Sequence, residues 1–439
     1  MKVTKFGGSS LANPEQIRKV KAIIESDSDR QVVVVSAPGK DDYIKQKVTD
    51  LLLAIAGENT KISYLNAVTM LQDRFMQICR AFNLSDLEKS ILSEIDLLSE
   101  ESRDFIASRG EYWNAQIMAQ VLDLPFFDAK DFISLKENNK PQLDLDKTAN
   151  LLQELKLKSF VFPGFYGDFK GRVATFSRGG SDLTGSILAF ALNAELYENW
   201  TDVNGLYYAS PKIVTNPKTI PSLTYKELRE LTYMGFDAFH DEAMFPLIRG
   251  KIPVRIKNTN NPAFPGTLIS EYPGKSETSI SGIAAKPGFA YVEIEKYLMN
   301  SEKGFGMKVL KVFSDLGLSY EHAPSGIDNI AVVLDGNNGF ADKKEELTRR
   351  LTNELNPDYI GFQDNLALIA VVGRGMRSTP GIMSRISASL AKDRINIELI
   401  NQGPSETNVV LGVAEEDYQQ SVRTIYDEFI LNPKGGEKW

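Results

Sequence analysis

The fold class is decided by the opening stretch, KVTKFGGSSLANPEQIRKV at residues 2–20. Residues 2–6 are typical of a buried strand, and Asn13 before Pro14 predicts that a helix begins there, with Gln16 at the capping-box position. The two glycines and two serines in between indicate a backbone that approaches another group closely. Lys5, just before the turn, indicates that this group is an anion.

The strand–turn–helix order of this stretch recurs along the chain. An apolar run at 31–36 ends in the turn SAPGK, and a glycine-punctuated loop at 163–171 precedes a helical pattern from about 181. AELYENWTDVNG, residues 194–205, is typical of a further strand that ends in a turn. Strands alternating with helices over about 270 residues predict an α/β sandwich with a mainly parallel central sheet.

Length, charge and cysteine content limit the class of protein. A chain of 439 residues predicts two or three domains, and the net charge of −8 argues against broad binding to nucleic acid. The longest apolar runs, such as 366–372, are too short to span a bilayer, and no secretory signal pattern follows Met1, so we expect a cytoplasmic protein without a membrane partner. The single cysteine excludes an intramolecular disulfide, and two histidines make a histidine-rich metal site improbable.

The C-terminal part contains an internal repeat. Residue 304 aligns with 381 and residue 334 with 411 without a gap, and the aligned pairs include Val309 with Ile386 and Glu321 with Glu398. The pattern predicts helix, strand, turn and strand, used twice, with each helix covering its own small sheet. We therefore expect a catalytic α/β domain over 1–280 and two α+β modules over 281–361 and 362–439.

Two glycine-rich loops are candidate anion sites, although neither common nucleotide-binding motif is present. KFGGSS places Lys5 and free backbone N–H groups at the end of a strand, and SRGGSD at 177–182 places Arg178 and two glycines just before a helix. Either loop alone could be a tight turn that simply needs glycine. Two such loops in one α/β unit, each with its own cation, favour a phosphate site.

Two further stretches have plain structural interpretations when taken alone. Glu111, in ASRGEYWNAQ, is expected at a glycine break before an amphipathic helix, where a carboxylate meets the helix dipole. TDVNGLYY, residues 201–208, is more often a hairpin turn than a ligand site.

In combination and in this order, KFGGSS, SRGE, SRGGSD, TDVNGLYY and the repeat resemble the amino-acid kinase superfamily, and within it the aspartokinases. The resemblance covers nearly the whole chain, and the repeat looks like tandem, ferredoxin-like ACT domains. It implies ATP-dependent phosphorylation of the L-aspartate side-chain carboxylate to 4-phospho-L-aspartate, in lysine, threonine and methionine biosynthesis. That carboxylate is ionised at pH 7, so catalysis needs positioning and charge neutralisation rather than a general base.

The resemblance also implies site residues, with Arg178 binding a carboxylate of aspartate and Glu111 its α-ammonium. The implied catalytic residues are Lys5, Gly8 and Asp182. The implied substrate contacts are Thr49, Glu111, Phe165, Thr175, Arg178 and Ser181. The implied nucleotide contacts are Lys5, Gly7, Gly8, Ser9, Ser36, Thr201, Asp202, Tyr207 and Lys212. Mg²⁺ is implied by ATP, and the sequence shows no protein cluster that would ligate it.

The chain departs from the family pattern at several of these positions. Ser177 stands where a glycine is usual, Ser210 where an acid is usual, and Lys212 where an arginine is usual. A lysine cannot offer the bidentate fork of an arginine. Glu242 aligns with a usual lysine, which leaves the contribution of Lys257 to nucleotide binding open.

For the repeat, the resemblance implies an amino-acid effector, with lysine favoured over threonine, and a homodimer or homotetramer formed through the ACT modules. The implied effector residues are Met299, Phe305, Ser319, Tyr320, Glu321 and Ser325. The alternative is that Glu321 and Glu398 are equivalent strand residues that face solvent. The rival functions are a kinase for glutamate or N-acetylglutamate, and an amino-acid sensor without catalysis. A fused homoserine dehydrogenase is not expected, because no dinucleotide fingerprint is present.

Overall fold

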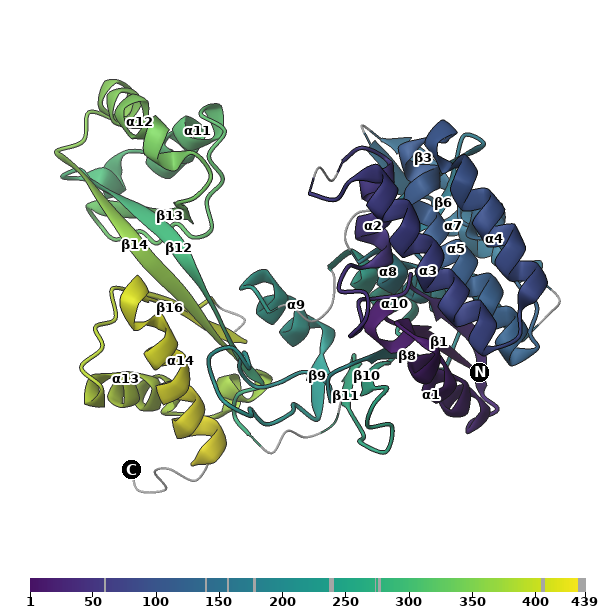
Figure 1. Cartoon of the computed structure of the whole chain (residues 1–439). Coiled ribbons are helices and arrows are strands. Elements are labelled where there is room, and N and C mark those ends of the chain that lie inside the picture. Colours follow the sequence, from purple (N-terminus) through teal and green to yellow (C-terminus); the bar gives the residue numbers. More distant parts are fainter. Residues whose placement is uncertain are drawn as a thin grey trace. The chain divides into compact units, whose positions relative to one another are not determined.

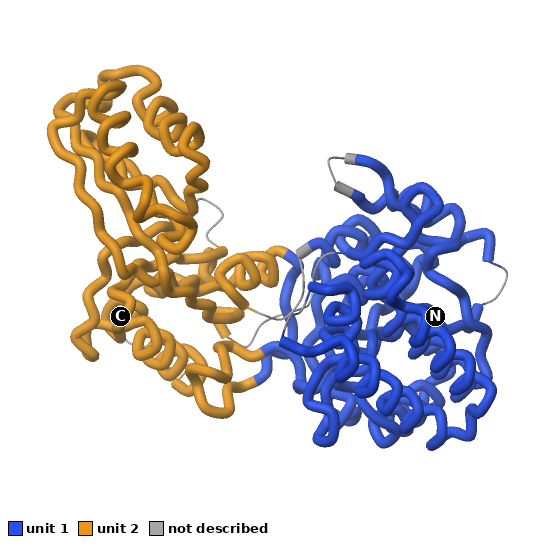
Figure 2. The backbone as a smooth tube through the Cα atoms, turned by 45° about the horizontal axis from the view of Figure 1, so that its top comes forward, with its two compact units in different colours: residues 1–206, 219–225, 237–274 blue, residues 207–218, 226–236, 275–439 orange. Residues whose placement is uncertain are grey.

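The computed structural model describes residues 1–58, 61–138, 140–155, 158–176, 179–236, 241–272, 274, 278–403 and 407–432. The chain divides into two compact units (Figure 2). Unit 1 contains residues 1–206, 219–225 and 237–274, and unit 2 contains residues 207–218, 226–236 and 275–439.

The described part of unit 1 contains a seven-stranded, mainly parallel sheet in the order β5-β2-β1-β8-β10-β11-β9. The strands run over Phe160–Pro163 (β5), Arg30–Val35 (β2), Lys2–Phe6 (β1), Leu196–Thr201 (β8), Val254–Asn258 (β10), Thr267–Ser270 (β11) and Ser222–Thr224 (β9). The first five are parallel, and β11 is antiparallel to β10. This confirms the predicted α/β class and its mainly parallel sheet.

Helices cover both faces of this sheet. Phe6 and Trp200, which are register partners, belong to a core shared with α1, α2, α3, α4 and α5, whereas Tyr197 on the opposite face packs against Gly185 of α8. The helices of unit 1 are α1 (Pro14–Glu25), α2 (Val48–Ile55), α3 (Tyr64–Ala81), α4 (Ser85–Leu97), α5 (Arg103–Leu122), α6 (Ala129–Phe132), α7 (Leu145–Gln153), α8 (Gly180–Ala191) and α10 (Asp241–Gly250). The β3–β4 (Leu135–Asn138, Lys140–Leu143) and β6–β7 (Tyr166–Phe169, Arg172–Thr175) pairs form separate two-stranded sheets.

The start of α1 confirms half of the predicted cap. The Asn13 side chain accepts a hydrogen bond from the Gln16 backbone N–H at 3.0 Å, and Pro14 is the first helical residue. The Gln16 side chain does not complete the capping box. Its amide nitrogen donates to Asn260, in the loop after β10, at 3.1 Å, and its amide oxygen accepts no hydrogen bond from the described residues.

The described part of unit 2 contains a five-stranded antiparallel sheet in the order β13-β12-β14-β16-β15. In Figure 1, α11 and α12 cover one end of the long pair β12–β14, and α13 and α14 cover the other. The strands are β12 (Gly282–Glu295), β13 (Asn329–Asp335), β14 (Tyr359–Val372), β15 (Leu399–Asn401) and β16 (Asn408–Ala414). The helices are α11 (Phe305–Asp315), α12 (Phe340–Leu355), α13 (Ile382–Lys392), α14 (Tyr418–Tyr426) and, from Lys226 onward, α9 (Tyr225–Tyr233).

The two copies of the repeat begin alike. Gly304 and Gly381 both adopt the left-handed conformation, with φ of 77° and 86°, and each is the N-cap of a helix, α11 or α13. The next strand differs between the copies. It is β15 in the second copy, whereas in the first copy His322 and Ser325 form only isolated bridges to β13. Each copy adds a further helix, α12 or α14, that the sequence did not predict.

Strand β12 pairs with both copies. Residues 289–295 lie between β13 and the first half of β14, while residues 282–286 pair with 368–372 in the second half of β14. Gly288, with φ of 90°, separates these two parts. The strand that completes the second copy therefore precedes the first copy in the chain, and the domain limits 1–280, 281–361 and 362–439 stay a prediction.

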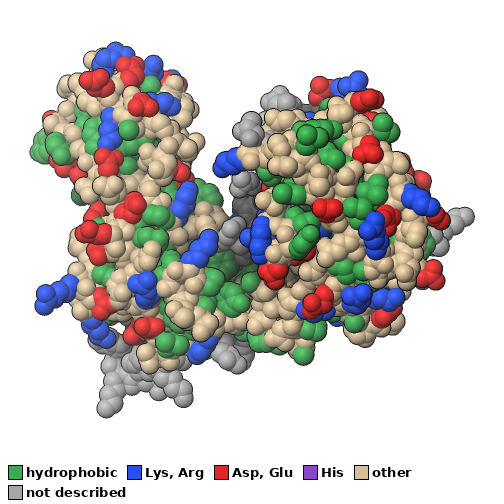
Figure 3. Space-filling view, in the orientation of Figure 1, with side chains coloured by type: hydrophobic (Ala, Val, Ile, Leu, Met, Phe, Trp, Pro, Cys, Tyr) green, Lys and Arg blue, Asp and Glu red, His purple; other side chains and the backbone are tan. Residues whose placement is uncertain are grey.

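Within the described residues, no helix is both long and apolar enough to cross a membrane. On the face that Figure 3 draws, lysine and arginine side chains are interspersed with aspartate and glutamate on each unit.

Candidate active site

The carboxyl end of β1 brings together two predicted catalytic residues. The Lys5 ammonium lies 2.6 Å from an Asp182 carboxylate oxygen, and the Asn199 amide donates to the same oxygen at 2.9 Å. Lys5 and Asn199 are register partners in β1 and β8, and Asp182 is in the first turn of α8. Asn199 was not predicted from the sequence. The signal that could have identified it is its position beside Lys5, which requires the register between β1 and β8.

Close backbone packing fixes the first glycine turn. A Cβ on Gly8 would lie 2.8 Å from the Ala37 carbonyl oxygen, and the Gly39 N–H donates to the Gly8 carbonyl oxygen at 2.8 Å. The Gly7 N–H donates to the Trp200 carbonyl oxygen at 3.0 Å, so it has a partner within the protein. The nucleotide contacts of Gly7 and Gly8 both stay predictions.

The remaining predicted residues of this edge are accessible to different degrees. Ser9 is exposed, and Ser36, directly after β2, is half-buried. Thr49 is half-buried in the first turn of α2. The structure thus places the three at element ends, where side chains remain open to solvent.

The second glycine loop leads into α8. Gly179 is the N-cap with φ of 78°, and a Cβ on Gly180 would lie 2.7 Å from the Phe165 ring. Phe165 itself has φ of 83°, and its N–H donates to the Thr184 hydroxyl at 3.1 Å. Ser181 packs against Gly164, where a Cβ would lie 2.6 Å from the Ser181 side chain. The predictions for Ser177 and Arg178 lie outside the described residues.

Glu111 overturns the expectation of a glycine break and a helix start. Gly110 and Glu111 are both inside the 20-residue helix α5. A Cβ on Gly110 would lie 2.7 Å from the Ala37 Cβ and 3.0 Å from Val48, so this glycine permits close packing and does not end a helix. The hydrophobic burial of the helix thus outweighed the poor helix propensity of one glycine.

The Glu111 carboxyl group is buried, with 5% of the residue exposed. Burial raises its pKa to about 8, although a hydrogen bond from the Ala37 backbone, the Lys5 charge and the Ser181 hydroxyl oppose the rise. Its Oε2 accepts no hydrogen bond from the described residues. The site therefore contains a buried acid that is poised near neutral pH and has one oxygen left for a donor.

Thr175 has protein partners for its polar groups. Its hydroxyl donates to Asp104 at 3.0 Å, and Arg103 donates to the same hydroxyl at 3.0 Å. Thr201, at the end of β8, donates to the exposed Asp202 at 3.2 Å.

The other residues considered for nucleotide binding belong to different elements of the chain. Tyr207 and Lys212 belong to unit 2, where Tyr207 is half-buried and Lys212 exposed. Glu242 is exposed on α10. The Lys257 ammonium lies 5.0 Å from the centroid of the Trp200 ring, on the opposite sheet face from Lys5, and burial lowers its pKa.

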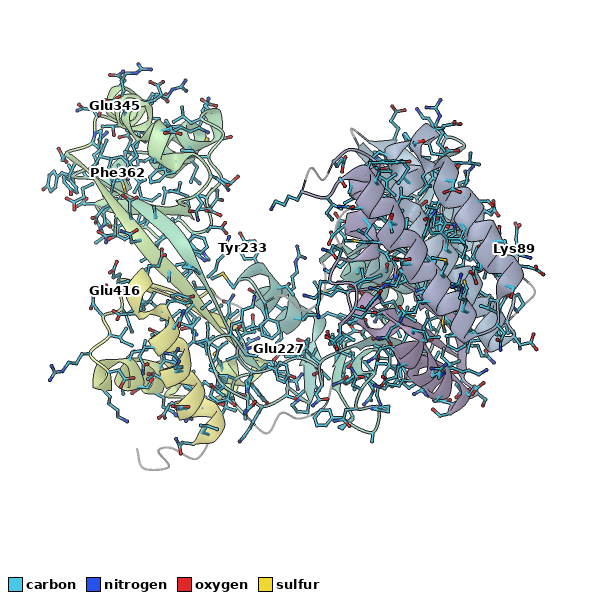
Figure 4. All side chains as sticks on the ribbon, in the orientation of Figure 1. Lys89, Glu227, Tyr233, Glu345, Phe362 and Glu416 are labelled. Carbon is cyan, nitrogen blue, oxygen red and sulfur yellow. The ribbon has the colours of Figure 1, made fainter. Side chains whose placement is uncertain are left out.

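The six predicted effector residues differ in burial. Met299 and Phe305 are in the hydrophobic core of the first copy, whereas Ser319, Tyr320 and Ser325 are exposed. The half-buried Glu321 donates its N–H to the Val333 carbonyl oxygen at 2.8 Å, as Glu398 does to Gly412 at 2.9 Å. The two glutamates thus have the same backbone role, but the Glu321 carboxylate also accepts a hydrogen bond from Tyr233 at the end of α9, labelled in Figure 4.

Comparison with known proteins identifies the family. An amino acid kinase family model matches residues 1–258, and an ACT domain model matches residues 369–429. Aspartokinase 3 of Bacillus subtilis is 40% identical over 452 residues, which cover 98% of each chain. This chain belongs to the amino acid kinase family, as an aspartokinase. The predicted family and activity are thereby confirmed: the kinase phosphorylates the side-chain carboxylate of L-aspartate, a step of amino-acid biosynthesis.

Solved structures agree with this fold over nearly the whole chain. The crystal structure of Clostridium acetobutylicum aspartate kinase has a TM-score of 0.87 at 42% identity and covers 98% of this chain and 100% of that one. Escherichia coli aspartokinase III in complex with aspartate and ADP has a TM-score of 0.73 at 23% identity and covers 98% and 99%, and this likeness supports the fold alone.

Proposed function

We propose that Lys5 neutralises the charge that develops on the transferring phosphoryl group of ATP, and that Asp182 and Asn199 hold the ammonium in place. The observation that carries this proposal is the 2.6 Å contact between Lys5 and Asp182 at the carboxyl end of β1. Ligands of open α/β sheets bind at this edge. The acceptor carboxylate is ionised at neutral pH, so positioning and electrostatic stabilisation supply the catalysis.

The amino-acid end of the site is proposed to form around Glu111. Its unpartnered Oε2 would accept from the α-ammonium of aspartate, and Ser181 lies beside it. Arg178 is proposed to bind a carboxylate, with Thr49, Phe165 and Thr175 shaping the pocket. A structure of Escherichia coli aspartokinase III in complex with aspartate and ADP supports aspartate and a nucleotide as the ligands of this site.

Mg²⁺ is proposed to arrive with the nucleotide. Among the described residues, no group of three or more histidine, cysteine, aspartate or glutamate side chains could hold a metal ion. Asp182 supplies a carboxylate beside Lys5. This donor set fits an ion that is ligated mainly by phosphate oxygens and water, and when bound the ion would offset phosphate charge.

The regulatory unit is proposed to bind lysine in preference to threonine, near Ser319 and Glu321, in a cytoplasmic homodimer or homotetramer formed through the ACT modules. A structure of Escherichia coli aspartokinase III with lysine and aspartate supports an amino-acid effector of this kind. The Tyr233–Glu321 hydrogen bond distinguishes Glu321 from its repeat partner Glu398.

The first test is ADP release from Mg-ATP with aspartate, glutamate or N-acetylglutamate. We expect turnover with aspartate alone, and we expect Lys5→Ala to lower kcat at least about a hundredfold, because a preorganised charge is removed. Lys2→Ala is the matched control, since Lys2 is on the same strand but pairs with Asp27 at 2.6 Å. Near-normal kcat in Lys5→Ala would refute the phosphate assignment.

The effector proposal has a separate test within the repeat. Glu321→Gln should raise the lysine concentration for half-inhibition about tenfold, because a carboxylate that could bind an ammonium is neutralised. Glu398→Gln should leave that concentration unchanged. Equal effects from both variants would favour two equivalent strand residues without an effector role.

A further inference from the structure

Asn114 is a fully buried polar residue on α5 that the established chemistry does not use. Its side-chain amide donates to the Ser36 carbonyl oxygen at 2.7 Å. One helical turn earlier, the Glu111 carboxyl group lies close to the Ala37 backbone, which opposes the rise in its pKa. The Ser36 carbonyl and the Ala37 nitrogen belong to one peptide unit, so α5 is in contact with this peptide along its length.

A third residue of α5 is fitted to the same peptide. Gly110 lies so close to Ala37 that a Cβ would come within 2.7 Å of the Ala37 Cβ. Gly110, Glu111 and Asn114 are on one face of the helix, because residues three or four apart are neighbours there. This face of α5 therefore fixes residues 36 and 37 through one close packing contact and the hydrogen bond from Asn114.

The held peptide is in turn packed against the glycine turn of the kinase site. The Ala37 carbonyl oxygen lies 2.8 Å from the place that a Gly8 Cβ would occupy, and the Gly39 N–H donates to the Gly8 carbonyl oxygen at 2.8 Å. No side chain is interposed in these contacts, since they join backbone to backbone. A displacement of residues 36–39 would thus be passed to Gly8 without being absorbed by a flexible side chain.

Satisfying a buried carbonyl would be a simpler role for Asn114, but it leaves part of the side chain unexplained. Its Oδ1 is buried and accepts no hydrogen bond from the described residues. An unsatisfied buried group is uncommon in a native interior and needs a reason. Keeping an amide at this position is understandable if the hydrogen bond to Ser36 is required for function.

We propose that Asn114 is a positioning residue of the kinase site, which holds the Ser36 carbonyl and, together with Gly110 packed on Ala37, keeps residues 36–39 against Gly8. The proposal rests on the phosphate-binding role proposed above for the Gly8 turn. Asn114 acts through the backbone and does not itself contact a substrate.

The test compares Asn114→Leu, which keeps the approximate shape and loses the donor, with Gln116→Leu, the same kind of change at a half-buried position of α5. Steady-state kinetics are measured with Mg-ATP and aspartate, well below the melting temperature of each variant. We expect Asn114→Leu to lower kcat at least about tenfold with the aspartate KM within about threefold, because misplacing a reacting group mainly reduces the chemical step. Gln116→Leu should match the wild type.

A purely structural role would lower the melting temperature of Asn114→Leu and leave kcat within about twofold of the wild type, which would overturn the proposal. A raised aspartate KM with unchanged kcat would overturn it too, because Asn114 would then serve the amino-acid end. If Asn114→Leu does not fold, Asn114→Ala, which also lacks the donor, takes its place, and the same limits on kcat and on the aspartate KM decide. Absence of aspartate-dependent turnover in the wild type would instead refute the proposed function.

Discussion

The two glycine pairs of unit 1 look alike in the sequence, but the structure requires them for different reasons. Gly8 needs no unusual φ, and its missing Cβ makes room for the Ala37 carbonyl and for Gly39. In the second pair, Gly179 adopts φ of 78°, whereas a Cβ on Gly180 would meet the Phe165 ring. One loop is thus set by the approach of another loop, and the other by the conformation that starts a helix.

This difference shows what a glycine pair does and does not predict. Both pairs were expected to approach an anion, yet each first approaches the protein itself. The packing of Gly8 on residues 37–39 makes the first turn rigid before any ligand binds. A phosphate site at this turn would therefore be preorganised, which is the condition for electrostatic catalysis.

Adding a methyl group to each residue of the first pair should separate Gly8 from Gly7 most strongly in activity. Gly8→Ala should lower kcat at least about a hundredfold, since its Cβ meets backbone that cannot move aside. Gly7→Ala should cost at most about tenfold, because its nearest neighbour would be 3.6 Å away and its φ of −71° suits any residue. Steady-state kinetics with thermal melts check both variants, and a larger loss for Gly7→Ala would contradict this account.

The second pair should respond less, and chiefly in stability. Gly180→Ala overpacks the contact with Phe165 and should lower the free energy of unfolding by about 1–3 kcal/mol. Gly179→Ala should cost about 1 kcal/mol, because it places a side chain in the left-handed region. Urea unfolding measures the free energy of unfolding of both variants. Equal losses would mean that the left-handed conformation of Gly179 and the packing of Gly180 contribute equally to stability.

A pH dependence of stability is expected from Glu111, whose carboxyl group lies near Lys5 and Ser181. Its pKa is about 8 in the folded chain against 4.5 in the unfolded chain, so the folded state binds the extra proton between these values. The free energy of unfolding should therefore fall as pH rises from about 4.5 to about 8. Glu111→Gln should flatten this fall in urea unfolding series, and an unchanged slope would assign it to other groups.

Local sequence patterns were sufficient for much of the fold and for part of the site. The strands at 2–6 and 31–36, the Asn13 cap and the repeated helices α11 and α13 follow from patterns within a few residues of each other. The roles of Lys5 and Asp182 at one site were implied by the family resemblance, and the two glycine loops alone did not predict that these side chains meet.

The missed features depend on contacts that are distant in the chain. Gly110 was taken as a helix break because the local sequence shows only a glycine. The residues that pack against it, Ala37 and Val48, come from other elements and are far away in the chain. Asn199 becomes visible only when the register of β1 and β8 is known, and Asn114 only when its partner Ser36 is known. Pairing between segments far apart is the information that periodicity does not contain.

The double use of β12 has a consequence for the order in which unit 2 folds. All strands of the first copy are contiguous from residue 289, so this copy can fold as soon as it has left the ribosome. Residues 282–286 must wait for 368–372, a delay on the order of ten seconds at ordinary rates of synthesis. When the first copy folds, it brings the two ends of its own chain together and removes most of the loop-closure entropy that the second copy would otherwise have to overcome. The first copy therefore acts as a folding template for the second, and variants that slow its folding should expose the apolar edge of 282–286 to aggregation.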